Sequence, residues 1–171
     1  MRKFLGLWGS FLAALLLCAA PASSKGAEVK FKTAEARHFD RAEGVELTPE
    51  FSDYLYAELR AQLAKTKIFG QVVGEGEVVE DADAPASVVV TGTLTEYKKG
   101  NVAAEVIVGF GVGRRSLKMK VNVVRRSDQK ILGSIPVEVK APATWNEKFL
   151  AVEAAKRIAK EVKNSLEHEG S

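Results

Sequence analysis

The pattern of hydrophobic and polar residues is clearest in the middle of the chain. Over residues 117–123, Leu, Met, Val and Val occupy every second position, and Lys118, Lys120 and Asn122 lie between them. Because successive side chains of a strand point to opposite faces, this alternation predicts a strand with one buried face and one face in water.

Similar alternation on either side of this segment predicts further strands. Residues 88–97 precede it, and residues 131–139 follow it after a polar reversal at 125–130. The shortness of that reversal predicts an antiparallel hairpin. Pro136 lacks an N–H group, so the last strand is expected at a sheet edge or at a local bulge. The residues expected on the buried face of that strand are Ile131, Ile135, Val137 and Val139.

Earlier in the chain, a short strand signal is followed by a strong helix signal. Val29 and Phe31 alternate with lysines, which predicts a first strand. Thr48 followed by Pro49 is typical of a helix N-terminus, and Gly70 is expected to stop the helix. The apolar stripe of this helix recurs at four-residue spacing through Phe51, Leu55, Leu59 and Leu63.

A second helix is predicted near the C-terminus, where Thr144 and Glu147 have the spacing of a capping box. Its expected buried residues are Phe149, Val152, Ala155, Ile158, Ala159, Val162 and Leu166. The element order is strand, helix, three or four strands and helix. This order predicts an α+β fold with a mostly antiparallel sheet of four to five strands and two helices packed on one face.

The N-terminus has the three-part pattern of a secretory signal. Arg2 and Lys3 precede an uncharged run over residues 4–20, and an Ala-Pro-Ala motif follows, so we expect cleavage before Ser23. The alternative is a retained membrane anchor, although the uncharged run is near the lower length limit for crossing a bilayer. The expected division is a cleaved signal at 1–22, a flexible leader at 23–27, a single domain at 28–167 and a polar tail at 168–171.

Cys18, the single cysteine, lies inside this signal. Lipoprotein signals place a cysteine after a short box that ends in a small residue, whereas Leu17 is bulky. Lipidation of Cys18, which would make the protein an outer-membrane lipoprotein, therefore remains an alternative to cleavage before Ser23. Cleavage there removes the only thiol, and with it any disulfide or thiolate site.

Charge gives little support for nucleic-acid binding. The chain carries 25 basic and 22 acidic residues, a net charge of +3, but Arg2 and Lys3 belong to the signal. Without them the chain is close to neutral, whereas nucleic-acid-binding domains usually carry a basic stripe. We therefore expect no nucleic-acid partner.

Three glycines at every second position raise a separate question. Gly109, Gly111 and Gly113 are followed by Arg114 and Arg115 and then by a strand pattern. A phosphate-binding loop leads into a helix, so a nucleotide loop is the least supported interpretation. We expect an extended segment whose bare face permits a bulge or the close approach of another backbone. The alternative is contact of these five residues with an anion or a partner.

The same residues resemble a bacterial envelope family called domain of unknown function 4410. The resemblance rests on Gly100, the Gly-Phe-Gly-Val-Gly run at 109–113, the "VVVTGTLTEYKKG" strand and turn, and "KIFGQVV" after the first helix. It covers roughly residues 28–165. The chain departs from the family at Ser-Asp-Gln-Lys (127–130), where an Asp-x-x-Thr-Gly type of turn is more usual. The resemblance implies secretion or lipid anchoring and supplies no catalytic residue.

Recognisable catalytic and metal motifs are missing. His38 and His168 are far apart and match no metal-binding spacing. There is no Gly-x-Ser-x-Gly nucleophile motif, and the acidic stretch at 75–85 lacks the spacing of a calcium loop. Asp40 follows His38 closely enough to orient its ring in a catalytic site, but we expect His38 to be an exposed loop residue. A hydrolase that uses His38 with carboxylates is a minor alternative.

The sequence therefore predicts an exported, non-enzymatic envelope domain, periplasmic or secreted, that acts by protein or surface interaction. It is expected to need no cofactor or metal, to bind an envelope protein, and to have no integral membrane span after signal cleavage. Association with a membrane surface is a further option. The main alternative is a periplasmic domain that binds a small ligand or anion through the glycine-rich segment and Arg114/Arg115.

Overall fold

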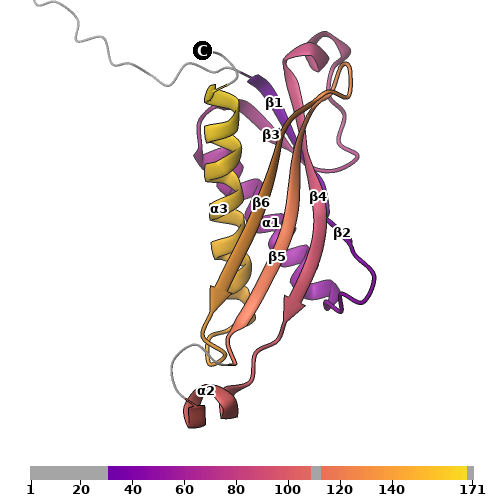
Figure 1. Ribbon diagram of the computed structural model, residues 1–171. Coiled ribbons are helices and arrows are strands. Elements are labelled where there is room, and N and C mark those ends of the chain that lie inside the picture. The colour runs from indigo at the N-terminus through magenta and orange to yellow at the C-terminus, as the bar shows by residue number, and fades with distance from the viewer. Residues whose placement is uncertain (1–30, 109–112, 169–171) are drawn as a thin grey trace, which may run out of the picture.

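The computed structural model describes residues 31–108 and 113–168 (Figure 1). The predicted signal, Cys18 and the leader lie outside these residues, as do Gly109, Gly111 and the end of the polar tail. The strands are β1 (Phe31–Ala36), β2 (Asp40–Arg41), β3 (Phe69–Val73), β4 (Ser87–Lys98), β5 (Arg115–Arg125) and β6 (Ile131–Ala141). The helices are α1 (Pro49–Lys65), α2 (Val102–Val108) and α3 (Glu147–His168), and a 3-10 helix spans Asp81–Ala86.

The strands form one mixed sheet in the order β3-β1-β4-β5-β6, and the short β2 pairs with β4. Antiparallel ladders join β4 to β5 and β5 to β6 along most of their length. Strand β1 lies parallel to both β3 and β4. The sheet is thus mostly antiparallel, which confirms the predicted α+β class.

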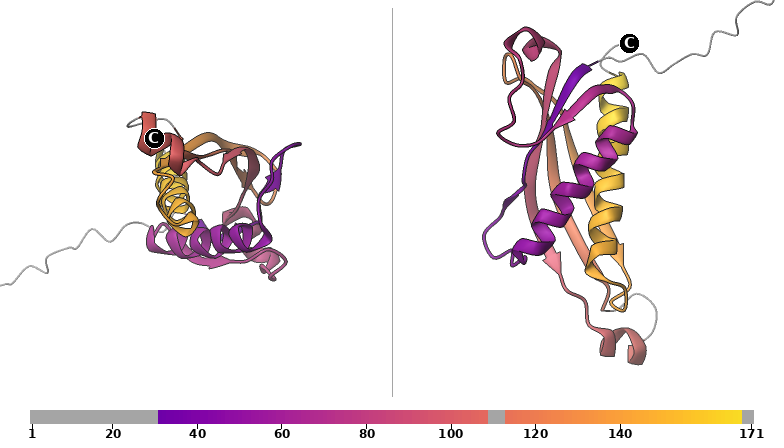
Figure 2. Two further views of the ribbon diagram at one scale, coloured as in Figure 1. Left: turned by 90° about the horizontal axis from the view of Figure 1, so that it is seen from below. Right: turned by 180° about the vertical axis from the view of Figure 1, so that it is seen from behind.

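Helices α1 and α3 pack against each other and against the same face of the sheet (Figure 2). The predicted stripe of α1 is buried there, and so are the inward residues of β4 and β5, including Val88, Leu94, Leu117 and Val121. Thr48 caps α1 as predicted, since its Oγ1 accepts a hydrogen bond from the Phe51 amide at 3.3 Å. The core therefore lies between the two helices and the sheet.

The opposite face of the sheet is partly covered as well. The segment from Gly74 to Ala86 runs over the starts of β1 and β4 and packs on them through its 3-10 helix. Val79 from this segment and Val89 of β4 are buried. Because of this cover, the outward residues of β1 do not face open water.

Strand β3 and the end of α1 differ from the prediction. Helix α1 stops at Lys65, where the Thr66 hydroxyl donates a hydrogen bond to the Leu63 carbonyl at 2.6 Å. Lys67 then adopts a left-handed φ of 58° and redirects the chain. Gly70 is therefore not the helix stop but a residue of a strand that the sequence pattern did not predict.

Strand β6 lies at a sheet edge, as Pro136 predicted. Its pairing with β5 passes from Val123–Gly133 to Val124–Ile131, so Leu132 forms a bulge. The bulge reverses the phase of the alternation, since an extra residue turns the following side chains to the other face. Ile131, predicted to be buried, is 58% exposed, and Leu132 is buried instead.

Helix α3 also begins differently from the prediction. It starts at Glu147, and the Asn146 Oδ1 accepts a hydrogen bond from the Lys148 amide at 2.9 Å. Asn146 therefore takes the capping role predicted for Thr144. Phe149, expected in the core, is exposed, because the buried face of the helix begins one position later with Leu150.

Candidate functional site

Two glycines, Gly100 and Gly113, lie close together where the link between β4 and β5 begins and ends, and we call this pair the neck. We call the described residues of this link, 100–108 and 113, the arm. At its base, the Asn101 amide donates a hydrogen bond to the Gly113 carbonyl at 2.6 Å. Gly100 and Gly113 have left-handed φ values of 78° and 84°. A Cβ at Gly100 would lie 2.8 Å from the Gly113 carbonyl oxygen, so both conformation and space require glycine there.

The arm contains a helix that the sequence pattern did not predict. Of the three glycines predicted to be extended, only Gly113 lies among the described residues. It lies in a turn, so the prediction of an extended segment is wrong there. The N-terminus of α2 is capped by Asn101, whose Oδ1 accepts a hydrogen bond from the Ala104 amide at 3.2 Å. The strand predicted after the glycines is confirmed, since β5 begins at Arg115.

The two arginines after the glycines have different surroundings. Arg115 is largely buried: its Nε donates to the Ala143 carbonyl at 3.1 Å, and its Nη1 lies 3.2 Å from the Glu147 Oε1. The Tyr97 hydroxyl donates to the same carboxylate oxygen at 2.9 Å. Arg114 is exposed. Arg115 therefore joins β5 to the start of α3, and only Arg114 has its side chain in open water.

Burial of Tyr97 raises the pKa of its hydroxyl to about 12, and the hydrogen bond to Glu147 contributes further. The hydroxyl is thus held in its protonated, donating form. Tyr97, Arg115 and Glu147 form a polar cluster that ties β4, β5 and α3 together at the base of the arm.

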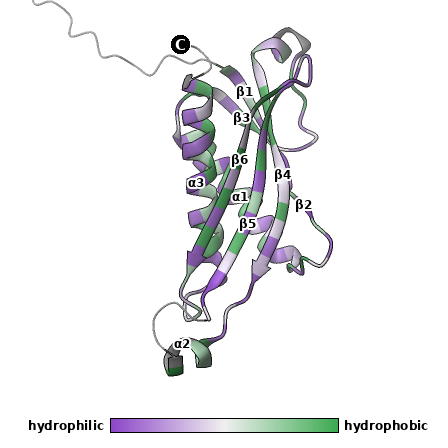
Figure 3. Cartoon of the chain, viewed as in Figure 1, coloured by the Kyte–Doolittle hydropathy of each residue, from purple (hydrophilic) through white to green (hydrophobic). Residues whose placement is uncertain are grey.

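Exposed apolar side chains gather around this base. We call Val102, Ile107, Trp145 and Phe149 the apolar end; their exposed fractions are 47%, 81%, 45% and 40%. The rings of Trp145 and Phe149 meet edge to face, 4.3 Å between centroids. Helix α2 has no extensive packing against another helix or strand of the described chain. Figures 1 and 3 show α2 beyond the ends of β5 and β6, with green, hydrophobic positions.

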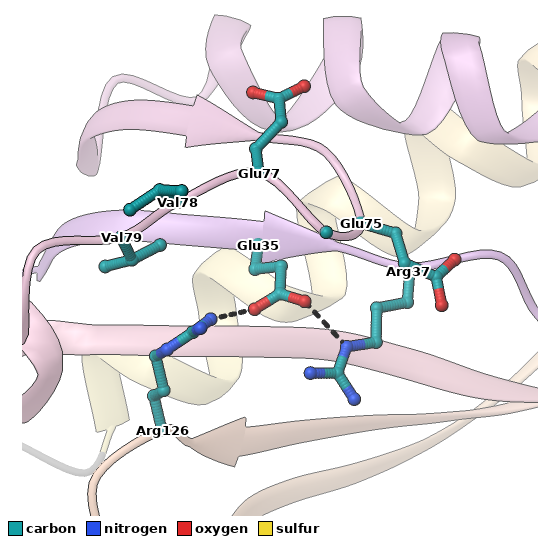
Figure 4. Close-up of a pocket in the computed structure, with 8 residues that line it drawn as sticks. Glu35, Arg37, Glu75, Glu77, Val78, Val79 and Arg126 are labelled. Atoms are coloured by element: carbon teal, nitrogen blue, oxygen red, sulfur yellow. Dashed lines mark hydrogen bonds and ion pairs between the residues drawn. The ribbon is translucent and has the colours of Figure 1, made fainter.

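A second feature is a hollow of about 430 Å³ on the outer face of β1 (Figure 4). Glu35 lies at its floor and is buried. The Arg37 Nε donates to one of its carboxylate oxygens at 2.7 Å, and the Arg126 Nη1 pairs with the other. Residues 75–79 form the rim. Both carboxylate oxygens are thus engaged by guanidinium groups, an arrangement that holds strands together.

His38 lies near the other side of this rim. Its ring stacks on Tyr56 at 3.9 Å between centroids, and its Nδ1 lies 3.0 Å from the Glu75 Oε2. Its Nε2 is 3.7 Å from the Asp53 Oδ1. Hydrogen bonds from the ring and the backbone of His38 lower the pKa of Glu75. The carboxylate beside the ring is therefore Glu75 and not Asp40. His38 is an exposed loop residue, as predicted.

The residues that the structure describes include no group of three or more His, Cys, Asp or Glu side chains placed to hold a metal ion. None of the helices in this described part of the chain is long and apolar enough to cross a membrane.

Comparison with known proteins places the chain in a family. The model of the family described as Domain of unknown function (DUF4410) matches residues 23–145. The chain belongs to the DUF4410 family. This match confirms the resemblance seen in the sequence. No curated protein sequence matches the chain.

Solved structures similar to this DUF4410 chain share its fold. The PelC dodecamer from Paraburkholderia phytofirmans has a TM-score of 0.54 and 10% identity, over 77% of this chain and 87% of that one. The hypothetical protein CT253 from Chlamydia trachomatis has a TM-score of 0.54 and 9% identity, over 80% of this chain and 98% of that one. At such low identities the likeness establishes the fold alone.

In this DUF4410 chain the sequence predicted the glycine and arginine residues of the site but not its apolar residues. Gly113, Arg114 and Arg115 do lie at the base of the arm. Trp145 and the apolar residues of α2 were not singled out, because apolar residues in a sequence are expected in the core. The sequence does contain a signal for helix α2: Asn101 is a capping residue, and the helix-favouring residues Ala-Ala-Glu follow at 103–105.

Proposed function

We propose that this DUF4410 chain is an exported, non-enzymatic domain of the bacterial cell envelope that acts by contact with another protein or surface. The contact is made by the apolar end. One observation carries the proposal: four large apolar side chains from two separate segments are exposed at one end of the molecule. Single exposed hydrophobic residues are normal, whereas a group of them marks an interaction site.

The polar clusters support a non-enzymatic role. Glu35 is engaged by two arginines, and the Tyr97–Arg115–Glu147 cluster ties secondary-structure elements together. These charged groups serve the fold, and an active site would instead hold a reactive group open to a substrate.

Export is supported by the pattern of residues 1–22. Mass spectrometry of the protein isolated from its bacterium tests this part. We expect a mature N-terminus at Ser23. Lipidated Cys18 would instead make the protein an anchored lipoprotein, and an intact N-terminus in the cytoplasm would contradict export.

Contact through the apolar end is tested by capture and by assembly state. The variants are Trp145→Ser and Ile107→Ser, and the matched control is Ile131→Ser, an exposed apolar residue at the opposite end of β6. The envelope partner, or a larger assembly measured by light scattering, should be lost in the first two variants and kept in the control. Equal behaviour of all three variants would contradict the proposed contact. PelC, a dodecamer of similar fold, is the reason for including assembly in this test.

A further inference from the structure

We propose that the apolar end inserts shallowly into the surface of an anionic lipid bilayer. This inference rests on the proposed function, because it names the surface that the apolar end contacts. The first observation in its favour is the exposed tryptophan, Trp145. Trp145 combines a large apolar ring with a polar N–H group, and such rings concentrate at the boundary between lipid and water.

Charge around the apolar end favours an anionic surface. Lys99, Arg114 and Lys148 are exposed at this end of the molecule, and none forms an ion pair with a described acidic residue. Two acidic side chains at this end are engaged, Glu147 by Arg115 and Tyr97, and Glu96 by lysines. Helix α2 itself carries one acidic residue, Glu105. Cations close to a membrane surface are attracted by anionic headgroups.

The shape of this end favours lipid over a folded protein. Helix α2 lies beyond the ends of β5 and β6 and has no extensive packing against another helix or strand of the described chain (Figures 1 and 2). A protein partner would need a matching cavity to bury so convex a surface, because protein interfaces are closely complementary in shape. A fluid bilayer accepts a protruding apolar group without such a cavity.

The size of α2 sets the depth of insertion. A helix of seven residues is about 10 Å long, far too short to cross a bilayer. Its dimensions suit the boundary between headgroups and acyl chains, where interfacial helices lie. The neck at Gly100 and Gly113 joins this helix to the rigid sheet.

Trp145 provides a direct reporter. The chain has two tryptophans, and Trp8 lies in the predicted signal, so Trp8→Phe leaves Trp145 as the sole indole. The full chain carrying Trp8→Phe is mixed with vesicles of phosphatidylethanolamine with one-third phosphatidylglycerol, and in parallel with pure phosphatidylcholine vesicles. We expect a blue shift of Trp145 emission and protection from iodide with the anionic vesicles. A lipid anchor at Cys18 would attach the chain without changing this emission.

Variants separate the apolar and ionic contributions. Ile107→Ser should weaken vesicle binding by at least tenfold, and Ile131→Ser should leave it unchanged. Arg114→Gln should weaken binding to anionic vesicles by about fivefold and leave the weak binding to phosphatidylcholine unchanged.

Different results would overturn the lipid inference and the proposed function. Unchanged Trp145 emission with both vesicle types overturns the lipid inference. If the emission instead shifts with protein concentration alone, or with an envelope protein, the occupant is a second copy or that protein, and the proposed contact function survives. A cytoplasmic chain with its signal intact overturns the proposed function itself.

Discussion

At the scale of residues, Glu35 is the charged residue that the described structure buries most completely. Its carboxylate accepts a hydrogen bond from Arg37, just after β1, and a second from Arg126 at the β5–β6 turn. The second bond joins β1 to that turn. A buried carboxylate is costly unless its oxygens are paired and hydrogen-bonded, so this arrangement depends on both guanidinium groups.

Removal of one guanidinium should therefore destabilise the fold. We expect Arg126→Ala to lower the free energy of unfolding by about 1–3 kcal/mol, because Glu35 keeps only its bond to Arg37. Urea denaturation measures the effect. The control is the neighbouring Arg125→Ala, whose partner Asp128 lies at the surface, and which should cost less than about 1 kcal/mol. Equal losses in the two variants would show that burial of Glu35 does not matter.

Tyr97 gives stability a dependence on alkaline pH. Its pKa of about 12 in the folded protein exceeds its ordinary value of 10.0. The folded state therefore holds this proton more tightly than the unfolded state does. The corresponding stabilisation is complete below pH 10.0 and is lost as pH rises towards about 12.

Tyr97→Phe isolates this contribution from the titration of lysines. Near neutral pH the variant should be less stable by about 1–2 kcal/mol, because Glu147 loses a hydrogen bond. This difference should shrink as the pH is raised above 10.0 in parallel denaturation series of the two proteins. A difference that stays constant up to pH 12 would contradict the raised pKa of Tyr97.

At the scale of elements, the start of α3 deserves a direct test because two residues compete for the capping role. The Asn146 side chain accepts a hydrogen bond from the Lys148 amide, whereas Thr144 lies two residues earlier and is exposed. We expect Asn146→Ala to cost about 1 kcal/mol and Thr144→Ala to cost almost nothing. Thermal unfolding of both variants measures this, and the reverse ranking would restore the capping box that the sequence suggested.

The elements that sequence alone predicted are those whose signal is local. Helix α1 has a cap and a regular stripe, so its start and its buried face were predicted. Strand β5 alternates without interruption and was predicted nearly to its ends. Strand β3 is short and is stabilised by parallel pairing with β1, 38 residues earlier in the chain, so no local pattern reveals it. The bulge at Leu132 shows a third case, since one unpaired residue reverses the faces of its neighbours.

At the scale of the whole molecule, the candidate site depends on the topology. Residues of α2 and the pair Trp145–Phe149 are some 40 positions apart, yet both lie at the end of the sheet where β5 begins and β6 finishes. Antiparallel pairing of β5 with β6 brings them there. The sequence could identify Gly113, Arg114 and Arg115, but not their apolar neighbours, because gathering of distant residues is a property of the fold.

The position of β1 has a consequence for how the chain matures. This strand is the first described element, yet it lies between β3 and β4, both formed from later residues. During synthesis β1 has no complete set of neighbours until residue 98 has emerged, and β5 and β6 lack the cover of α3 until that helix follows. Such long-range pairing is slow to form, so we expect the nascent chain to stay open until β4 and α3 have been made. A chain held open in this way remains suited to threading through a narrow translocation pore.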